Sequence, residues 1–321
     1  MKQRINLKPL FVERMKLLLG DKEFKEYELS LEKFPIKSIR ANTLKISSEK
    51  LKKRLEEKKW IVKQPFKEFP EIMIIESNLL PGELGRTMEH LLGYYYVQEI
   101  SSMMPVLVLN PKDNEKILDL CSSPGSKTTQ IAAMINNTGV LIANDVKLRR
   151  IKILASNLER CGVTNSIITK ERGERICRSL EKEDFKMDRI LVDAPCSGEG
   201  TLRESPKTAK MWNVKRINTL SRIQKSLLEK AINALKTNGE IVYSTCTHGP
   251  EENEEVVDFI LKNFDNVKIQ KINLPKELKT REGLTEWKEK TYSKDLKKCA
   301  RIYPHEDNCE GFFIAKMKKI K

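Results

Sequence analysis

The fold class is decided by the stretch Glu115-Lys-Ile-Leu-Asp119-Leu-Cys-Ser-Ser-Pro-Gly125-Ser-Lys-Thr-Thr-Gln130. It begins with a short apolar run typical of a buried strand, passes through a loop with a single glycine and enters a helix. The loop lacks the Gly-x4-Gly-Lys spacing of a nucleotide phosphate loop. It predicts instead a tight turn that presents backbone N–H groups at a helix N-terminus, which suits a ligand carboxylate.

A second strand follows that helix and ends in an acid, in Gly139-Val-Leu-Ile-Ala-Asn-Asp145. An acid at the tip of the second strand of a βαβ unit can accept two hydrogen bonds from a ribose diol. Together with the turn, it indicates a nucleoside ligand that carries a carboxylate and no phosphates. S-adenosylmethionine fits this description better than a dinucleotide does.

Two further apolar runs each lead into a cysteine, in Arg189-Ile-Leu-Val-Asp193-Ala-Pro-Cys196 and in Glu240-Ile-Val-Tyr-Ser-Thr-Cys246. Both read as buried parallel strands with their exit loops. In an open α/β sheet the ligand crevice lies outside the carboxyl ends of the strands, so both thiols are expected in the active site. From about residue 90 onward, strands alternate with helices, which predicts a doubly wound, Rossmann-like α/β sheet.

The first 90 residues predict a small α+β region, with a junction near Pro81-Gly82. Its β-α-β-β order is that of an RNA-recognition-type module, but the aromatic signature for base stacking is missing. We therefore expect a helical and RRM-like RNA-binding region at 1–90 and a methyltransferase domain at 91–321. The elements expected in the first region are two short helices within 1–30, a strand at 36–44, a Ser-capped helix at 47–60, and strands at 61–63 and 72–75.

Composition favours a polyanionic partner. The chain has 321 residues and a net charge of +15, and lysines that neutralise phosphates release counterions. The alternative is a generally Lys/Glu-rich surface, since 45 acids accompany 60 bases. Seven cysteines without a Cys-x-x-Cys pair, and only three histidines, argue against a disulfide scaffold or a metal site. No apolar run approaches 18 residues, so we expect no membrane contact. The cysteine usage predicts a reducing cytoplasm, and we expect a monomer.

With these motifs in view, the chain resembles the RNA cytosine-5 methyltransferases of the Nol1/Nop2/Sun family. The resemblance runs from about residue 35 to the end, and in size the chain is similar to the archaeal tRNA-modifying branch. The matching motifs, in the family's order, are Tyr96-Val-Gln-Glu-Ile-Ser-Ser102, Asp119 to Gln130, Asp193-Ala-Pro-Cys-Ser-Gly-Glu-Gly-Thr201, Tyr243-Ser-Thr-Cys-Thr247, Arg301-Ile-Tyr-Pro-His305 and Glu310-Gly-Phe-Phe-Ile-Ala315.

The resemblance implies covalent catalysis, because C5 of cytosine is a poor nucleophile. A thiolate that adds to C6 turns C5 into an enamine carbon, which can attack the sulfonium methyl group. By the resemblance, Cys246 is the attacking thiol, Cys196 assists release of the product, and Asp193 supplies an acid or hydrogen bond at N3. DNA cytosine-5 methyltransferases use the Pro-Cys thiol instead, so the Ser-Thr-Cys motif separates the two readings. The alternatives are purely structural: the two cysteines could be buried and unreactive, and Asp193 could only cap a turn.

The cofactor would be held by the loop, the acid and residues near them. Lys127 could instead face solvent, and Arg150 could simply pack at the sheet edge. After the third strand, relatives carry an Asp at the adenine amino group where this chain has Arg172, so the neighbouring Glu171 or backbone groups would take that contact. The predicted cofactor-binding residues are Cys121, Ser122, Ser123, Pro124, Gly125, Ser126, Lys127, Asp145, Arg150, Glu171 and Asp193.

Three functions compete. The first is S-adenosylmethionine-dependent methylation of C5 of cytosine in RNA, with tRNA favoured because there is no room for a large extra substrate domain, and rRNA as runner-up. The second is an RNA-binding assembly factor with a degenerate site, against which the intact Cys246, Cys196 and Asp193 argue. The third is an amino-group methyltransferase, which would need an aromatic residue where Cys196 stands.

Overall fold

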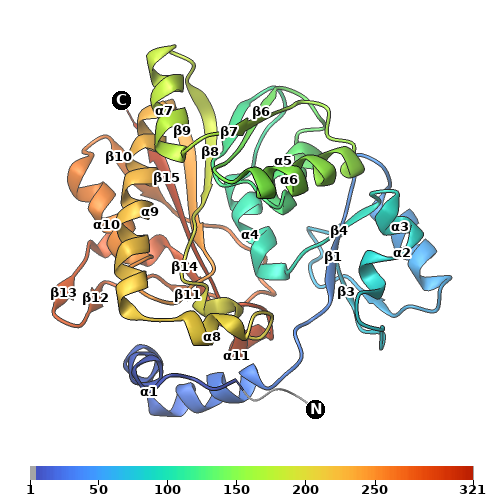
Figure 1. Cartoon of the computed structure of the whole chain (residues 1–321), viewed down its shortest axis with the longest axis horizontal. Coiled ribbons are helices and arrows are strands. Elements are labelled where there is room, and N and C mark those ends of the chain that lie inside the picture. Colours follow the sequence, from blue (N-terminus) through green and yellow to red (C-terminus); the bar gives the residue numbers. More distant parts are fainter. Residues whose placement is uncertain (1–4, 321) are drawn as a thin grey trace.

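Five parallel strands form the centre of the large sheet in the computed structural model, which describes residues 5–320 (Figure 1). They lie in the order β7-β6-β5-β8-β9, and β15 pairs antiparallel to β9. Three short strands, β10, β14 and β11, extend the sheet beyond β15. The bounds are β5 (Lys116–Asp119), β6 (Val140–Asp145), β7 (Ser166–Lys170), β8 (Met187–Asp193), β9 (Leu235–Thr245), β10 (Val267–Gln270), β11 (Arg281–Glu282), β14 (Ala300–Ile302) and β15 (Phe312–Lys319).

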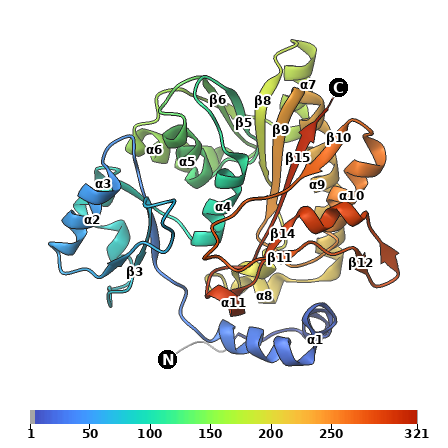
Figure 2. The same cartoon turned by 180° about the vertical axis from the view of Figure 1, so that it is seen from behind.

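Helices cover both faces of this sheet (Figures 1 and 2). Neighbouring strand residues point to opposite faces, so Ile190 and Val192 of β8 belong to one hydrophobic cluster and Leu191 to the other. Strands buried on both faces explain the continuous apolar runs of the sequence. The helices on one face are α4 (Ile100–Leu109), α5 (Ser126–Met134) and α6 (Leu148–Cys161), and those on the other are α7 (Gly173–Lys182), α9 (Val214–Ala234) and α10 (Glu254–Asn263).

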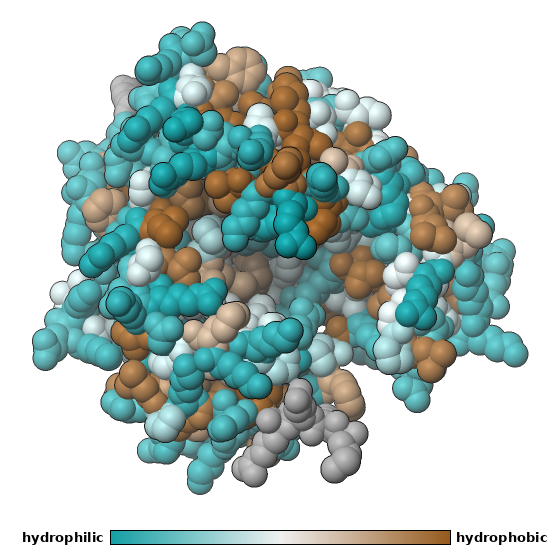
Figure 3. Space-filling model, viewed as in Figure 1, coloured by the Kyte–Doolittle hydropathy of each residue, from teal (hydrophilic) through white to brown (hydrophobic). Residues whose placement is uncertain are grey.

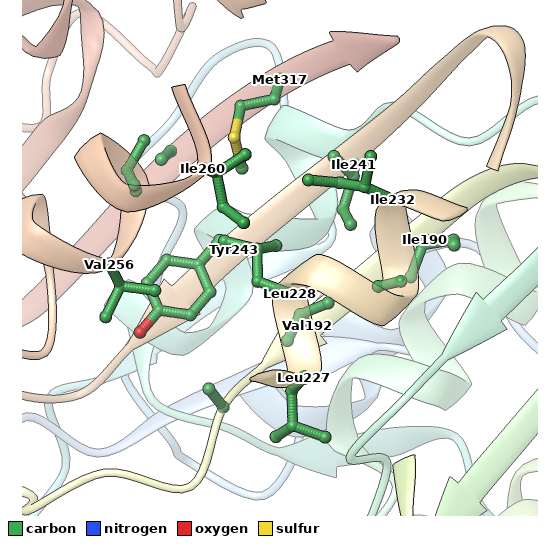
Figure 4. Close-up of a cluster of buried hydrophobic side chains, with 14 of the residues drawn as sticks. Ile190, Val192, Leu227, Leu228, Ile232, Ile241, Tyr243, Val256, Ile260 and Met317 are labelled. Carbon is green, nitrogen blue, oxygen red and sulfur yellow. The ribbon is translucent and has the colours of Figure 1, made fainter. Parts of the chain in front are cut away.

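Figure 4 shows how α9 and α10 pack on the sheet. The side chains of Ile190, Ile241 and Tyr243 meet those of Leu228 and Ile260, and all are fully buried. Each such side chain contributes about 1.5–3 kcal/mol by leaving water. This core fixes the two strands, β8 and β9, whose exit loops carry the predicted catalytic thiols.

The connections between the parallel strands define where a ligand can bind. From β5 the chain moves outward through β6 to β7, and then returns to β8 and β9 on the other side of β5. The strand order therefore reverses between β5 and β8. A crevice opens outside the carboxyl ends of strands at such a point, so the ends of β5 and β8, Asp119 and Asp193, mark the expected site.

The N-terminal region contains a separate antiparallel sheet of order β2-β3-β1-β4. Its elements follow the order β-α-β-β-α-β of ferredoxin-like folds. The predicted strands at 36–44 and 61–63 are shorter than expected, and the sheet also takes in residues 95–97, which pair with β1. Its elements are β1 (Ser38–Ala41), α2 (Ser48–Glu56), β2 (Val62–Lys63), β3 (Ile72–Ile75), α3 (Met88–Leu91) and β4 (Tyr95–Val97).

Two helix predictions in this region agree with the structure. The side chain of Ser47 accepts a hydrogen bond from the backbone N–H of Lys50 and so caps α2. The first helix, α1 (Pro9–Leu31), is broken at Gly20, whose φ of 78° and ψ of 160° are not helical. It is therefore two short helices, because glycine adopts that conformation without a Cβ clash.

The N-terminal region packs against the large domain at two places. Helix α1 lies beneath the short helices α8 (Lys207–Met211) and α11 (Pro304–Asp307) in Figure 1, and the ring of Phe11 meets that of Trp212 edge-on at 5.3 Å. From β1, the buried Arg40 donates to the backbone oxygen of Ser126 at 2.7 Å and to Oγ1 of Thr129 at 2.8 Å, both in α5. The four-stranded sheet is thus tied to the start of α5.

Candidate active site

Cys196 and Cys246 lie side by side at the carboxyl ends of β8 and β9. Their Sγ atoms are 3.1 Å apart, and both residues are half-buried. The backbone N–H of Gly200 donates to the backbone oxygen of Cys246 at 2.9 Å, which ties the two exit loops together. The two motifs that the sequence places at one edge of the sheet therefore meet in space.

The two thiols are not equivalent. The hydrogen bond with Cys246, and then burial, raise the pKa of Cys196 well above the usual value for a thiol. Cys196 therefore keeps its proton and can donate it in a hydrogen bond to Cys246. A thiolate is the nucleophilic form of cysteine, so the raised pKa makes Cys196 a poor nucleophile near neutral pH.

Asp193 and Lys127 form an ion pair beside the thiols. Oδ2 of Asp193 lies 2.8 Å from Nζ of Lys127, and Oδ1 accepts a hydrogen bond from the Ser244 hydroxyl at 2.8 Å. Nζ of Lys127 also donates to the hydroxyl of Ser102 at 2.9 Å. The Lys127 side chain is only 8% exposed, so the solvent-facing alternative for this lysine is wrong.

Two cavities of about 440 Å³ each meet at this point, and Figure 3 shows a hollow in this mostly hydrophilic face of the molecule. We call them the Asp145 cavity and the Glu310 cavity, after one residue that lines each alone. Both are lined by Cys121, Ser123, Asp193, Ala194 and Cys246, whereas Cys196 lines the Asp145 cavity alone. Cys246 is thus the thiol that faces both spaces.

The predicted cofactor loop forms the wall between the cavities. Ser122 donates through its backbone N–H and its hydroxyl to the backbone oxygen of Asn144, both at 2.9 Å, which holds the loop against β6. Gly125 has a φ of 105°, a conformation that favours glycine, and a Cβ there would come within 3.1 Å of Cδ1 of Leu154 in α6. Within this loop and the start of α5, the residues that line only the Glu310 cavity are Ser122, Pro124, Ser126 and Lys127.

Asp145 and Arg150 lie in the cavity named for the acid. Oδ1 of Asp145 accepts the backbone N–H of Lys147 at 3.0 Å. Oδ2 lies 3.3 Å from Nη1 of Arg150 but accepts no hydrogen bond from any residue that the structure describes. A buried carboxylate oxygen without a hydrogen bond is costly. The hydroxyls of a nucleoside ribose fit this oxygen, so the chemistry of the cavity is compatible with S-adenosylmethionine.

Glu171 lines the same cavity but is already engaged. Its Oε1 accepts the backbone N–H of Arg172 at 2.8 Å, and its Oε2 lies 3.5 Å from Arg175. Asn144 also reaches this segment, because its amide nitrogen donates to the backbone oxygen of Glu171 at 3.1 Å. The arginine side chain at 172 is 72% exposed. The Asp145 cavity thus contains the predicted adenine contact, although its carboxylate needs to turn to reach a ligand.

Sequence reasoning missed a group of acids in the Glu310 cavity, namely Glu99, Glu204 and Glu310. Glu99 and Glu310 lie in motifs quoted above whereas Glu204 does not, and the position of Glu310 depends on how β15 pairs with β9. Sequence reasoning also missed Asp119, which is fully buried, and burial raises the pKa of this carboxyl to about 7. The hydroxyl of Thr128 donates to Asp119 at 2.7 Å, so this acid supports the start of α5.

Residues 5–320 show neither a membrane-spanning helix nor a metal centre. Within that range, no helix is both long and apolar enough to cross a membrane. Nor does it contain a group of three or more His, Cys, Asp or Glu side chains placed to hold a metal ion. All seven cysteines are free thiols.

A sheet of this order with adjoining cavities at its switch point defines a nucleoside-dependent transferase of the methyltransferase type. Residues 106–318 match the family described as 16S rRNA methyltransferase RsmB/F, and residues 7–100 match the N-terminal domain of 16S rRNA methyltransferase RsmF. The chain therefore belongs to the RsmB/F family of methyltransferases, which is of the Nol1/Nop2/Sun type. This membership confirms the predicted fold class, an RNA cytosine-5 methyltransferase and S-adenosylmethionine as its cofactor.

Individual relatives agree with this family. The chain is 42% identical to the tRNA (cytosine(49)-C(5))-methyltransferase of Pyrococcus abyssi, over 99% of this chain and 97% of that protein. It is 37% identical to the ribosomal RNA small subunit methyltransferase F of Vibrio cholerae, over its whole length but only 65% of the relative. A solved methyltransferase homologue from Pyrococcus horikoshii has a TM-score of 0.85 at 34% identity, over 99% and 97% of the two chains.

A second solved structure, NSun6 from the same archaeon with SFG, has a TM-score of 0.82 at 24% identity and covers 99% of this chain and 100% of that one. At that identity the likeness shows the fold alone. It extends over the N-terminal sheet as well as the large domain, so both parts of this chain have their counterpart in one solved protein.

Proposed function

We propose that this protein methylates C5 of a cytosine in tRNA through a covalent bond between Cys246 and C6. One observation carries the proposal: Cys246 lies at the junction of two cavities, 3.1 Å from a second thiol. The thiol must reach C6 of the base while C5 of the same base faces the methyl donor, so a nucleophile between a base cavity and a donor cavity suits the reaction. The Asp145 cavity would take the methyl donor and the Glu310 cavity would take the base.

The residues divide the chemistry between them. Cys246 forms the S–C6 bond, and Asp193 in its protonated form donates a hydrogen bond to N3, which stabilises the negative charge that the ring gains on addition. Lys127 holds Asp193 in place through the 2.8 Å ion pair. When bound, S-adenosylmethionine supplies an electrophilic methyl group.

The final step releases the product. Transfer of the C5 proton to a water molecule, acting as the base, restores the C5=C6 double bond, and the electron pair of the S–C6 bond returns to Cys246. We assign assistance of this step to Cys196, because its thiol is the neighbour of the departing sulfur. The high pKa of Cys196 means that it can donate a hydrogen bond to that thiolate as it leaves.

The cofactor assignment rests on the Asp145 cavity. We propose that Asp145 accepts the ribose hydroxyls, with Arg150 beside it, and that Cys121 and Ser123, the loop residues that line this cavity, present backbone groups to the amino-acid part of the cofactor. Glu171 would meet the adenine amino group after its carboxylate turns away from Arg175. Ser126 and Lys127 line the other cavity, so we place these two on the base side.

The favoured substrate is tRNA, because the relative with nearly the same length as this chain is named for it. An rRNA is the second candidate, since the family description and the Vibrio cholerae relative name ribosomal RNA. A stacked cytosine hides C6, so the base must be flipped out at a cost of a few kcal/mol. We propose that residues 1–90 and the basic surface offset this cost through phosphate contacts, and that the enzyme is a cytoplasmic monomer.

The test is direct. The purified protein is incubated with S-adenosylmethionine and either unmodified tRNA or small-subunit rRNA, and the RNA is then sequenced after bisulfite treatment. We expect protected cytosines in tRNA with the wild type and none with Cys246→Ala. Protection in rRNA alone would replace tRNA as the substrate, and unprotected cytosines in both RNAs would contradict the proposed reaction.

A further inference from the structure

Glu310, the second residue before β15, is buried in the wall of the Glu310 cavity and is only 2% exposed. One of its carboxylate oxygens, Oε1, accepts a hydrogen bond from Nε of Arg203 at 3.2 Å. The other, Oε2, accepts none from residues 5–320. A buried carboxylate oxygen left without a donor is unfavourable, so this position calls for a ligand that brings an N–H group.

The carboxylate is held in place rather than free to turn away. The guanidinium of Arg203 also donates to the backbone oxygens of Asn308 and Cys309, which fixes the segment that leads into Glu310. The backbone N–H of Glu310 donates to Oε1 of Glu99 at 2.9 Å. Both ends of the residue are therefore anchored, and a pre-positioned acceptor gives selectivity at little entropic cost.

The same cavity contains the groups that would surround a pyrimidine ring. Cys246 lines it together with the Lys127–Asp193 pair, and the ring of Phe312 lies 5.3 Å from Nζ of Lys127. Asp193 is assigned above to N3. The neighbouring ring carbon of cytosine, C4, carries the exocyclic amino group. An acceptor in the same cavity is what that amino group requires.

We propose that Glu310 is a specificity-determining residue, which accepts a hydrogen bond from the exocyclic amino group of the target cytosine. This inference rests on the proposed function and adds the means by which the site rejects uracil. Uracil carries a carbonyl oxygen at that position, which would leave Oε2 without a donor and place two acceptors against each other. A site built around a substrate N–H discriminates strongly against analogues that lack it.

The electrostatics of the carboxylate agree with this role. Burial raises the pKa of Glu310 to about 8, with Glu99 and Glu204 adding to the effect and Arg203 opposing it. A neighbouring N–H donor favours the charged form of a carboxylate. Near neutral pH the unliganded Glu310 is therefore mainly protonated, and binding of a cytosine amino group would favour its charged form, which accepts the hydrogen bond.

Glu204 offers a matched comparison. It lines the same cavity, and burial likewise raises its pKa. Unlike Glu310, its side chain is exposed to solvent and has no hydrogen-bond partner in the described part of the chain. A carboxylate exposed to solvent gains little from one contact, so we do not expect Glu204 to set base selectivity.

The experiment compares two RNAs with two variants. The target cytosine is kept, or replaced by pyrimidin-2-one, which lacks the amino group, and kcat/KM for methyl transfer is measured for each RNA. For Glu310→Gln we expect a loss of about 10- to 100-fold with cytosine and less than threefold with pyrimidin-2-one. Because removal of the amino group also alters ring reactivity, the deciding quantity is the change in the ratio of the two values. Glu204→Gln should leave this ratio as in the wild type.

Equal losses on both RNAs in Glu310→Gln would indicate a structural role and overturn the proposal, as would no loss on either. Should Glu310→Gln fail to fold, Glu310→Asp, which keeps the charge but retracts it, is measured in the same way and should also lower the ratio. A wild type that methylates no cytosine in any RNA would overturn the proposed function itself, and the inference would fall with it.

Discussion

Replacing Asp145 by alanine gives a sharp test of the cofactor assignment. Oδ1 already accepts the backbone N–H of Lys147, so the structure leaves one oxygen, Oδ2, free for a ribose hydroxyl. One hydrogen bond to a charged group contributes about 1.5–3 kcal/mol. Asp145→Ala should therefore raise the Kd for S-adenosylmethionine about 10- to 150-fold. Isothermal titration calorimetry without RNA measures this quantity directly.

The chain offers a matched control in Asp258. This acid is also buried, its Oδ1 accepts the backbone N–H of Ser293 at 2.8 Å, and its Oδ2 pairs with Lys262 at 2.6 Å. It lines neither cavity. Asp258→Ala should therefore lower the melting temperature to a similar extent while leaving the cofactor Kd unchanged. A folded Asp145→Ala variant with wild-type affinity would refute the ribose assignment.

Three further outcomes follow from the site. Cys246→Ala should abolish turnover and any covalent RNA adduct, whereas Cys196→Ala should accumulate an adduct that resists denaturation on gels with RNA and cofactor; the reverse result would exchange their roles. Lys127→Met should lower kcat about 10- to 100-fold by releasing Asp193, and a large change in cofactor Kd by calorimetry instead would return Lys127 to the cofactor side. The pKa of Asp119 is raised to about 7 in the folded state, so its stabilising protonated form is complete near pH 4 and lost as pH rises through 7. Asp119→Asn should thus gain stability relative to the wild type between pH 5 and pH 8, by a few kcal/mol at most, and parallel pH profiles in urea denaturation would contradict this.

The parts of the fold that could be predicted are those in which local pattern and burial agree. Strands β8 and β9 are buried on both faces, so their apolar runs are unbroken and their exit loops stand out by proline, serine and glycine. The short strand β4 could not be predicted, because three residues carry no periodicity and it is the pairing of Ile39 with Val97 that makes them a strand.

The positions of the two thiols could be predicted from the sequence, whereas the position of Glu310 could not. Cys196 and Cys246 each follow a strand directly, so the rule for parallel sheets places them together. Glu310 is placed instead by the antiparallel pairing of β15 with β9, in which Phe313 lies opposite Thr245. The strand pairing joins residues far apart in sequence. No local sequence pattern therefore indicates that Glu310, which precedes β15, faces a cavity.

Arg40 joins the N-terminal sheet to the large domain, so deleting that sheet would not test RNA binding alone. A basic residue in the RNA-recognition-type module looks like a phosphate contact, yet Arg40 is 2% exposed, and burial lowers its pKa to about 10. It donates to the backbone oxygen of Ser126 and to Thr129, in the first turn of the helix that follows the 121–127 loop. Deleting the N-terminal sheet would remove this support and expose the core around Ile72, so the truncated enzyme would lose cofactor affinity together with RNA affinity. The N-terminal sheet is therefore part of the framework of the catalytic loop, and its RNA contacts are to be tested by substitutions on its exposed surface.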